Sequence, residues 1–164
     1  MKAGKNKLLI ELENKSLIYW TLKSIFSSAK VSWVGIIGQP DDKEKLLNSA
    51  KDFSYKVKWI NGGNTRQESV FNGLNSLPPE AQKVLIHDGA RCLITPELIN
   101  KCIIELEKNE AVILATKVTD TIKIVDKRGF IKKTPDRKFL WAAQTPQGFS
   151  CLLYTSDAAD DDHC

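Results

Sequence analysis

The chain alternates short apolar runs with segments of helical periodicity, and this alternation limits its fold more than any other feature. Strand-like runs at residues 31–38, 56–60, 84–87 and 111–116 are separated by helix-like segments at 41–53, 65–77 and 95–106, after a first helix expected at 17–27. Such alternation is typical of βαβ units. The runs VLI and AVILA lack polar residues, as expected for strands buried on both faces of a sheet. The pattern predicts an α/β, Rossmann-like fold: a mainly parallel sheet with helices on both faces.

The helix expected at 95–106 has the clearest start signal and the clearest apolar face. Thr95 is a good N-cap, and Pro96 suits the first helical position. The apolar face that follows consists of Leu98, Ile99, Cys102, Ile103 and Leu106. Cys102 is therefore expected to be a buried, reduced cysteine. The four cysteines of the chain form no CxxC pair, which argues against a structural zinc site.

The composition restricts location and partners. An apolar content of 42% is enough for a core, but no apolar run is long enough to cross a membrane. The first residues lack the apolar segment of a secretory signal, so we expect a cytoplasmic protein, or one of the plastid stroma in a plastid-bearing host. The net charge is +4, with the bases scattered. We therefore expect no nucleic-acid partner, and a small polyanionic substrate explains the positive charge equally well.

Residues 119–139 interrupt the alternation. Ile122 and Ile124 on one side, and Phe130 and Ile131 on the other, flank the sequence DKRG. This arrangement is typical of a β-hairpin with a glycine-containing turn. Two such strands bury too few apolar residues to be stable alone, so we expect this arm to lie against another surface, such as a second subunit.

Both ends depart from the pattern of a whole doubly wound domain. Polar residues and a short LLIEL run lead directly into the helix at 17–27, so we expect the first strand of the sheet to be missing. The loop after that strand usually binds the phosphates of the ligand. At the other end, CLLYTSDAADDDHC breaks abruptly from the preceding composition. We interpret 1–150 as one incomplete domain and 151–164 as a non-native tail, with a genuine acidic disordered tail as the alternative.

The sequence GGNTR at 62–66 lies between an expected strand and an expected helix. Paired glycines let a backbone approach a planar ligand closely, and Asn64 and Ser69 offer hydrogen bonds to the edge of a base. A tight turn with Asn64 or Thr65 as the helix cap explains the same residues. The motif alone leaves both interpretations open.

The sequence HDGAR at 87–91 places Asp88 and Arg91 at the end of the VLI run. Open α/β sheets bind ligands at the carboxyl ends of their strands. A carboxylate there can bind Mg²⁺ and a ribose hydroxyl, and an arginine can hold a phosphate through two hydrogen bonds. A local ion pair is the alternative. His87 is expected to be a core residue or one held in a fixed tautomer, and it is assigned no functional role.

Other polar residues have no specific meaning when taken alone. Thr121 in DTIK and Thr145 in QTPQ lie at element boundaries, where a threonine can simply cap a turn. Arg137 lies at the foot of the hairpin, and Lys7 precedes the apolar LLIEL run. Both are ordinary surface residues on local grounds.

In register, MKAGKNKLL, GGNTRQESV, IHDGAR, VTDTIK and TPDRKFLWAAQTPQGF resemble the 2-C-methyl-D-erythritol 4-phosphate cytidylyltransferases of the non-mevalonate isoprenoid pathway, over about residues 1–150. The resemblance implies transfer of a cytidylyl group from CTP to methylerythritol phosphate, with release of pyrophosphate and with Mg²⁺ present. It also implies a homodimer joined through the arm. The nucleophile of this reaction is already an anion, so alignment and charge neutralisation should suffice without a strong general base.

The resemblance assigns roles by position. Lys7 matches a lysine that contacts the triphosphate, and Arg137 matches an arginine that reaches the site from the partner subunit. Asp88 matches the carboxylate that binds the metal and the ribose. The loop that reads cytosine is matched by Gly62, Gly63, Asn64 and Ser69, with Asn64 in place of the usual aspartate. The groups around the methylerythritol phosphate are matched by Arg91, Thr121 and Thr145.

Parts of the family pattern are absent from this sequence. A glycine-rich loop and an arginine precede the position of Met1 in the family, and a threonine and a lysine lie in its closing segments. We therefore expect the 164-residue chain itself to be inactive. The alternatives are a ribitol-5-phosphate cytidylyltransferase and a non-catalytic fragment of either enzyme. A dinucleotide-dependent oxidoreductase is excluded because no GxGxxG follows a strand.

Overall fold

The computed structural model describes residues 6–151, so the tail expected at 151–164 lies outside this range except for Cys151. The chain begins with a 3-10 turn, η1 (Lys7–Leu9), and a small hairpin of β1 (Glu11–Leu12) and β2 (Lys15–Ser16). Glu13 and Asn14 form the hairpin turn with positive φ angles of 50° and 60°. Helix α1 (Leu17–Phe26) follows, with Ser16 as its N-cap. The helix expected at 17–27 is confirmed.

Two parallel strands form the first part of the core. Strand β3 (Val34–Gly38) pairs with β4 (Val57–Asn61) in parallel. Between them, the single helix expected at 41–53 is instead the short helix α2 (Lys43–Ser49), flanked by the 3-10 turns η2 (Pro40–Asp42) and η3 (Lys51–Lys56). Asn48 and Ser49 at the end of α2 are residues of low helix propensity, which is consistent with the end of the α-helix there.

The second part of the core has an antiparallel strand at its centre. Helix α3 (Arg66–Leu74) leads to β5 (Lys83–Ile86), and α4 (Pro96–Glu105) leads to β6 (Ala111–Lys117). Strand β9 (Trp141–Ser150) lies between β5 and β6 and pairs antiparallel with both. The sequence patterns did not predict β9, because Pro146 and Gly148 are residues that normally weaken a central strand.

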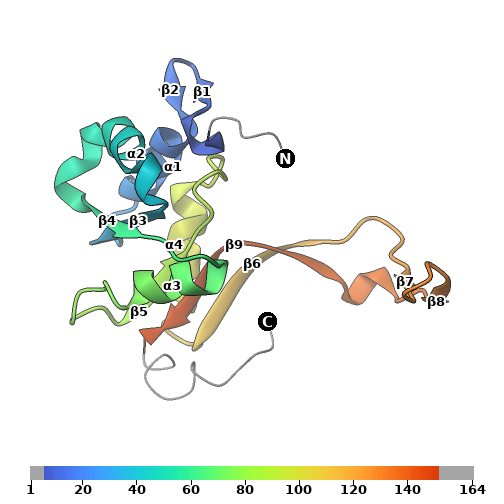
Figure 1. Cartoon of the computed structure of the whole chain (residues 1–164). Coiled ribbons are helices and arrows are strands. Elements are labelled where there is room, and N and C mark those ends of the chain that lie inside the picture. Colours follow the sequence, from blue (N-terminus) through green and yellow to red (C-terminus); the bar gives the residue numbers. More distant parts are fainter. Residues whose placement is uncertain (1–5, 152–164) are drawn as a thin grey trace.

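Helices cover both faces of β3, as expected for this fold class (Figure 1). Ile36 packs with Ile18 and Leu22 of α1 and with Leu46 of α2 in one buried cluster. The next residue, Ile37, faces the other way, and a Cβ added at Gly73 of α3 would lie 2.5 Å from its Cδ1 atom. The α/β class is therefore confirmed. In contrast, the expectation that the AVILA strand is buried on both faces is wrong, because α4 contacts β6 and leaves Ile113 50% exposed.

An apolar groove of about 600 Å³ separates the two parts of the core. Its walls come from β3 and β5, and from α1 and α3, through residues such as Ile25, Val34, Leu74 and Leu85. Strands β3 and β5 belong to different sheets and do not pair with each other. A groove with this lining removes less apolar surface from water than a continuous sheet would.

We expect the 164-residue chain to be marginally stable because of this groove. Domain stability is only about 5–15 kcal/mol, so a large unburied apolar surface can offset it. Heating should give a broad unfolding transition by circular dichroism, with binding of an apolar fluorescent dye at low temperature and a tendency to aggregate. A sharp, cooperative transition that CTP shifts upward, without dye binding, would contradict this expectation.

The hairpin arm projects from the ends of β6 and β9 (Figure 1). It contains β7 (Ile124–Val125), β8 (Ile131–Lys133) and the 3-10 turn η4 (Arg137–Phe139). Gly129 closes the β7–β8 turn with a φ of 87°, so the predicted hairpin is confirmed. Many apolar side chains of the arm and its foot are exposed, namely Ile122, Ile124, Val125, Phe130, Ile131, Phe139 and Trp141.

Cys102 of α4 is buried, with 1% of its surface exposed, which confirms the sequence expectation. Burial raises the pKa of its thiol above 9.0, against a weaker opposite effect of Lys101. Because the folded pKa exceeds the unfolded one, the folded state gains stability from the neutral thiol below pH 9.0 and loses it as pH rises through the folded pKa. Unfolding free energies measured across that range should fall more steeply for the unmodified chain than for Cys102→Ala. Equal slopes would refute this.

No helix among residues 6–151 is long and apolar enough to span a membrane.

Candidate active site at the carboxyl ends of the strands

Three polar loops follow β3, β4 and β5 at their carboxyl ends. Gln39 comes directly after β3, Gly62 directly after β4, and His87 directly after β5. The backbone of Gly62 donates a hydrogen bond of 2.8 Å to the carbonyl of Gly38, which joins the first two loops. Arg66 at the start of α3 reaches Asp88 across 3.9 Å, which joins the second loop to the third. The loops containing both sequence motifs therefore face one region at the carboxyl ends of β4 and β5.

The glycine loop packs closely against the first turn of α3. A Cβ added at Gly63 would lie 2.2 Å from the Cβ of Glu68, so no other residue fits there without displacing the helix. Gly63 donates its backbone N–H to the hydroxyl of Ser69 at 3.0 Å, and Asn64 donates its own to the Glu68 carboxylate at 2.5 Å. Thr65 caps α3 by accepting from the Glu68 N–H at 3.0 Å. The predicted helix cap is therefore present, and the loop backbone lies close against the first turn of α3.

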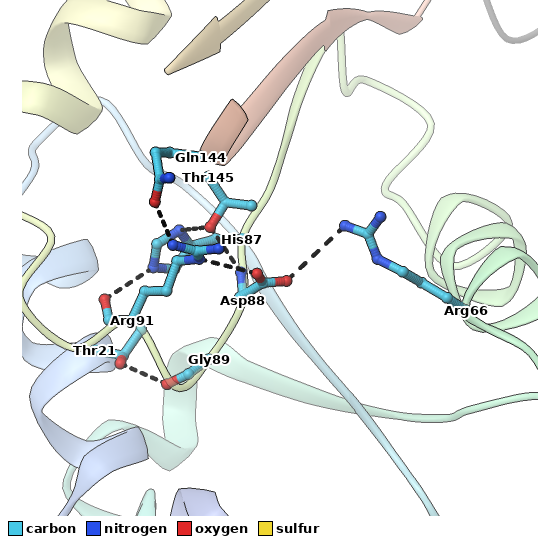
Figure 2. A network of polar contacts seen from close by, with 8 residues as sticks. All are labelled: Thr21, Arg66, His87, Asp88, Gly89, Arg91, Gln144 and Thr145. Atoms are coloured by element: carbon cyan, nitrogen blue, oxygen red, sulfur yellow. Dashed lines mark hydrogen bonds and ion pairs between the residues drawn. The ribbon is translucent and has the colours of Figure 1, made fainter. Parts of the chain in front are cut away.

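The side chain of Asp88 lies between two guanidinium groups (Figure 2). One carboxylate oxygen accepts a hydrogen bond of 3.0 Å from Nε of Arg91, and the other lies 3.9 Å from Arg66. The carboxylate is 45% exposed, so a ligand can reach it. The ion pair suggested as an alternative for Asp88 and Arg91 thus exists, and both side chains are partly exposed, at 45% and 44%.

A bulge in β9 brings two further side chains to this loop. The pairing of β6 with β9 shifts between Ile113 and Ala115, which leaves residues 144–146 outside the ladder. Gln144 accepts a hydrogen bond from the Arg91 guanidinium, and the Thr145 hydroxyl accepts one of 3.2 Å from the backbone N–H of Asp88. Thr145 is only 7% exposed. Bulges commonly redirect side chains toward functional sites, and this one supports the Asp88–Arg91 loop.

His87 lies under the same loop. Its Nδ1 atom is 3.0 Å from the Thr145 hydroxyl, and its Nε2 atom is 3.3 Å from the carbonyl oxygen of Arg91 (Figure 2). Burial lowers the pKa of His87 below 6.5, although hydrogen bonding to the Arg91 carbonyl and the nearby Asp88 carboxylate act in the opposite direction. The imidazole is therefore neutral at pH 7.

The turn that contains Lys7 lies beside the Asp88 loop. Asn6 caps this turn by accepting from the Leu8 N–H at 3.0 Å, and its amide donates to Asp42 at 2.8 Å. A Cβ added at Gly89 would lie 3.3 Å from Cδ2 of Leu8, so the two segments are in contact there. Lys7 is exposed and adjacent to this contact.

Two predicted site residues lie on the arm rather than at the loops. Thr121 and Arg137 are exposed. Arg137 donates a hydrogen bond of 2.6 Å to the carbonyl of Thr119, which links the two sides of the arm near its foot. The contacts of these two residues within the described part of the chain therefore do not place them at their own Asp88 loop.

Sequence reasoning assigned no role to several residues that hold the loops. Gln39 donates a hydrogen bond of 3.0 Å to the carbonyl of Gly63. The buried hydroxyl of Thr21 in α1 donates one of 2.7 Å to the carbonyl of Gly89. The spacing of Thr65 and Glu68 matches a capping box and was available as a signal. No local pattern indicates Gln39 or Thr21, because their partners lie 24 and 68 residues away.

The fold is that of an α/β nucleotidyltransferase. The crystal structure of 4-diphosphocytidyl-2C-methyl-D-erythritol synthase from Anaerococcus prevotii DSM 20548 matches with a TM-score of 0.87 and 32% identity, over 96% of this chain and 74% of that one. A further solved 4-diphosphocytidyl-2C-methyl-D-erythritol synthase matches with a TM-score of 0.76 and 33% identity, over 95% and 77%.

The sequence comparisons identify the family. The family model described as IspD, 2-C-methyl-D-erythritol 4-phosphate cytidylyltransferase, matches residues 1–162, and the chain belongs to this family. The protein of that name from Prochlorococcus marinus (strain MIT 9515) is 78% identical over 149 residues, 91% of this chain and 67% of that protein. The one from Parasynechococcus marenigrum (strain WH8102) is 53% identical over 149 residues, 91% of this chain and 66% of that protein. The chain thus spans about two thirds of the length of these relatives.

Proposed function

We propose that this chain supplies the cytidine, ribose and alcohol-phosphate side of a site that transfers a cytidylyl group from CTP to 2-C-methyl-D-erythritol 4-phosphate. The products are the CDP-alcohol and pyrophosphate. The observation that carries the proposal is the junction of the two loops, where Asp88 lies between Arg91 and Arg66 at the carboxyl ends of β4 and β5. The names of the relatives favour methylerythritol phosphate over ribitol 5-phosphate as the acceptor.

The glycine loop is proposed to read the cytosine. Gly62 and Gly63 are held by Gly38, Ser69 and Gln39, so the loop backbone is fixed before a ligand binds. The side-chain amide of Asn64 offers both a donor and an acceptor, which suits the edge of a base. Ser69 contributes by holding the loop, since its hydroxyl donates to the Thr65 carbonyl at 2.9 Å.

The reaction needs charge neutralisation more than proton transfer. An oxygen of methylerythritol phosphate forms a bond to the α-phosphorus of CTP, the bond from that phosphorus to the bridging oxygen breaks, and pyrophosphate leaves. Arg91 is proposed to hold the alcohol phosphate, with its guanidinium oriented by Asp88 and Gln144. Lys7, on the adjacent exposed turn, is proposed to contact the triphosphate and to stabilise negative charge that develops at phosphorus.

Asp88 fits a magnesium site of the kind that uses few protein ligands. Among residues 6–151, no cluster of three His, Cys, Asp or Glu side chains could hold a metal ion. Mg²⁺ commonly takes one or two carboxylates, with substrate phosphates and water completing its shell. The half-exposed Asp88 carboxylate can serve as that single ligand. A bound Mg²⁺ would neutralise phosphate charge there.

The arm is proposed to form a homodimer. Its exposed apolar side chains and its projection from the core suit a surface that a second copy covers. In such a dimer Thr121 and Arg137 would reach the partner's alcohol-phosphate site, which explains why they lie away from their own. We also propose that the reaction takes place in the cytoplasm.

The test uses a chimera in which this chain is joined to those segments of the Prochlorococcus marinus (strain MIT 9515) relative that lie outside the 149 matched residues. Pyrophosphate release is measured with CTP and methylerythritol phosphate, with ribitol 5-phosphate in parallel. Turnover with methylerythritol phosphate alone is the expected result. A folded chimera that turns over neither alcohol would refute the proposal, and preference for ribitol 5-phosphate would change the acceptor.

A further inference from the structure

His87 occupies a position that none of the assigned roles uses. Its imidazole lies between the bulge of β9 and the loop of residues 88–91, with Thr145 on one side and the Arg91 backbone on the other. The side chain connects parts of the chain 58 residues apart. It is the part of the HDGAR motif for which the sequence predicted a core or tautomer-fixed residue without a functional role.

The two contacts determine the tautomer of the neutral ring. The carbonyl oxygen of Arg91 can only accept a hydrogen bond, so Nε2 must carry the proton and donate across 3.3 Å. The neutral ring has one proton, and Nδ1 therefore accepts. Its partner at 3.0 Å is the hydroxyl of Thr145, which must donate its single proton to His87.

The Thr145 hydroxyl therefore has no proton left to donate to another group. It donates to His87 and accepts from the backbone N–H of Asp88 at 3.2 Å. With 7% of the residue exposed, this hydroxyl cannot donate to a substrate phosphate without releasing the imidazole. A chain of hydrogen bonds instead runs from the Arg91 carbonyl through His87 and Thr145 to the Asp88 amide. The chain of hydrogen bonds thus begins and ends in the loop of residues 88–91. From the same bulge, Gln144 also contacts this loop by accepting a hydrogen bond from the Arg91 guanidinium.

We propose that His87 is a positioning residue, and that Thr145 acts through it by fixing the Asp88–Arg91 loop rather than by binding the alcohol phosphate with its hydroxyl. The inference rests on the proposed function and refines it. The His87–Thr145 pair sets the backbone of both Asp88 and Arg91, so the carboxylate and guanidinium face the site in one arrangement. Without the pair, both side chains remain but their orientation is no longer fixed.

Four substitutions separate this role from a generic packing role. In His87→Asn the side-chain oxygen can take the place of Nδ1 as the acceptor for Thr145. In His87→Gln the amide nitrogen can take the place of Nε2 as the donor to Arg91, but no acceptor remains at the position of Nδ1. Thr145→Val removes the hydroxyl at constant shape, and Thr145→Ser keeps it.

The first measurement is made on the full chain without substrates, by long-range ¹H–¹⁵N correlation spectroscopy with ¹⁵N-histidine. The ring of His87 should show a protonated Nε2 and an unprotonated Nδ1. His163→Asn assigns the signals, since His87 and His163 are the two histidines. If the chain aggregates, the same spectrum is recorded on the chimera. A Nδ1-protonated ring would overturn the inference.

The second measurement is a double-mutant cycle in the chimera. His87→Gln and Thr145→Val should each lower kcat/KM about tenfold, and the double variant should lose no more than either alone, because both break the same hydrogen-bond chain. Part of the loss should appear as a higher KM for methylerythritol phosphate, with the KM for CTP little changed. Thr145→Ser should retain most activity. His87→Asn keeps the contact with Thr145 but loses the one with the Arg91 carbonyl, so it should be less impaired than His87→Gln.

Two further outcomes would overturn the inference: additive losses in the cycle, and a His87→Asn variant as impaired as His87→Gln. The cycle is also measured on unfolding free energy, which needs no substrate. A chimera without turnover could still show the expected tautomer and energetic coupling between His87→Gln and Thr145→Val. That result would refute the proposed function and support the role of His87. Turnover without coupling would do the reverse.

Discussion

Asp88→Asn in the chimera is expected to lower kcat by about 10²–10³-fold, the usual effect of removing one preorganised electrostatic group from an active site. The substitution keeps the shape of the side chain and one acceptor for Arg91, but it removes the charge that lies between Arg91 and Arg66. It also removes the single carboxylate proposed to bind Mg²⁺. Steady-state assays across a magnesium titration measure the effect, and the magnesium dependence should weaken together with kcat.

Controls separate a loss of chemistry from a loss of fold. Asp88 is half exposed, so its substitution should change the melting temperature little. Glu107→Gln removes an exposed carboxylate after α4 and should leave kcat unchanged. If Asp88→Asn keeps near-normal kcat and magnesium dependence, Asp88 forms only the local ion pair that its spacing to Arg91 also allows.

The sequence predicted this site in part because its local signals are strong. Each signal lies within a few consecutive residues: the end of a strand, the paired glycines, and the spacing of Asp88 and Arg91. They correctly place two loops at the carboxyl ends of strands. The N-caps of α1, α3 and α4 are equally local features. Their side chains, those of Ser16, Thr65 and Thr95, each accept a hydrogen bond from the first helical turn.

What the sequence missed depends on contacts between distant residues. The central position of β9 follows from its pairing with β5 and β6, and no pattern within WAAQTPQGF indicates it. The bulge at 144–146 brings the Thr145 hydroxyl to His87, a contact between residues 58 positions apart. For the same reason we propose a role for the half-buried His87 only from its two partners in the structure.

Mixing two inactive variants of the chimera, Asp88→Asn and Arg137→Ala, is expected to restore about a quarter of the activity of the unmodified dimer. The reason is geometric. If Arg137 reaches the partner's site, one of the two sites in a mixed dimer combines an intact Asp88 with an intact Arg137, while the other carries both changes. Random exchange makes half of the dimers mixed. Activity is measured after the two proteins are exchanged under mild denaturation and refolded together.

Matched mixtures test the assignment of each residue to its own or the partner's side. Lys7→Ala mixed with Asp88→Asn should remain inactive, because both residues belong to the same protomer's side and every site in the mixed dimer then carries one defect. Phe130→Asp places a charge on the exposed apolar arm and should give monomers in analytical ultracentrifugation, which would also prevent restoration. If Asp88→Asn and Arg137→Ala fail to restore activity although mixed dimers form, Arg137 acts within its own protomer. The arm would then contribute to assembly alone, and its hydrogen bond to Thr119 would be a structural contact.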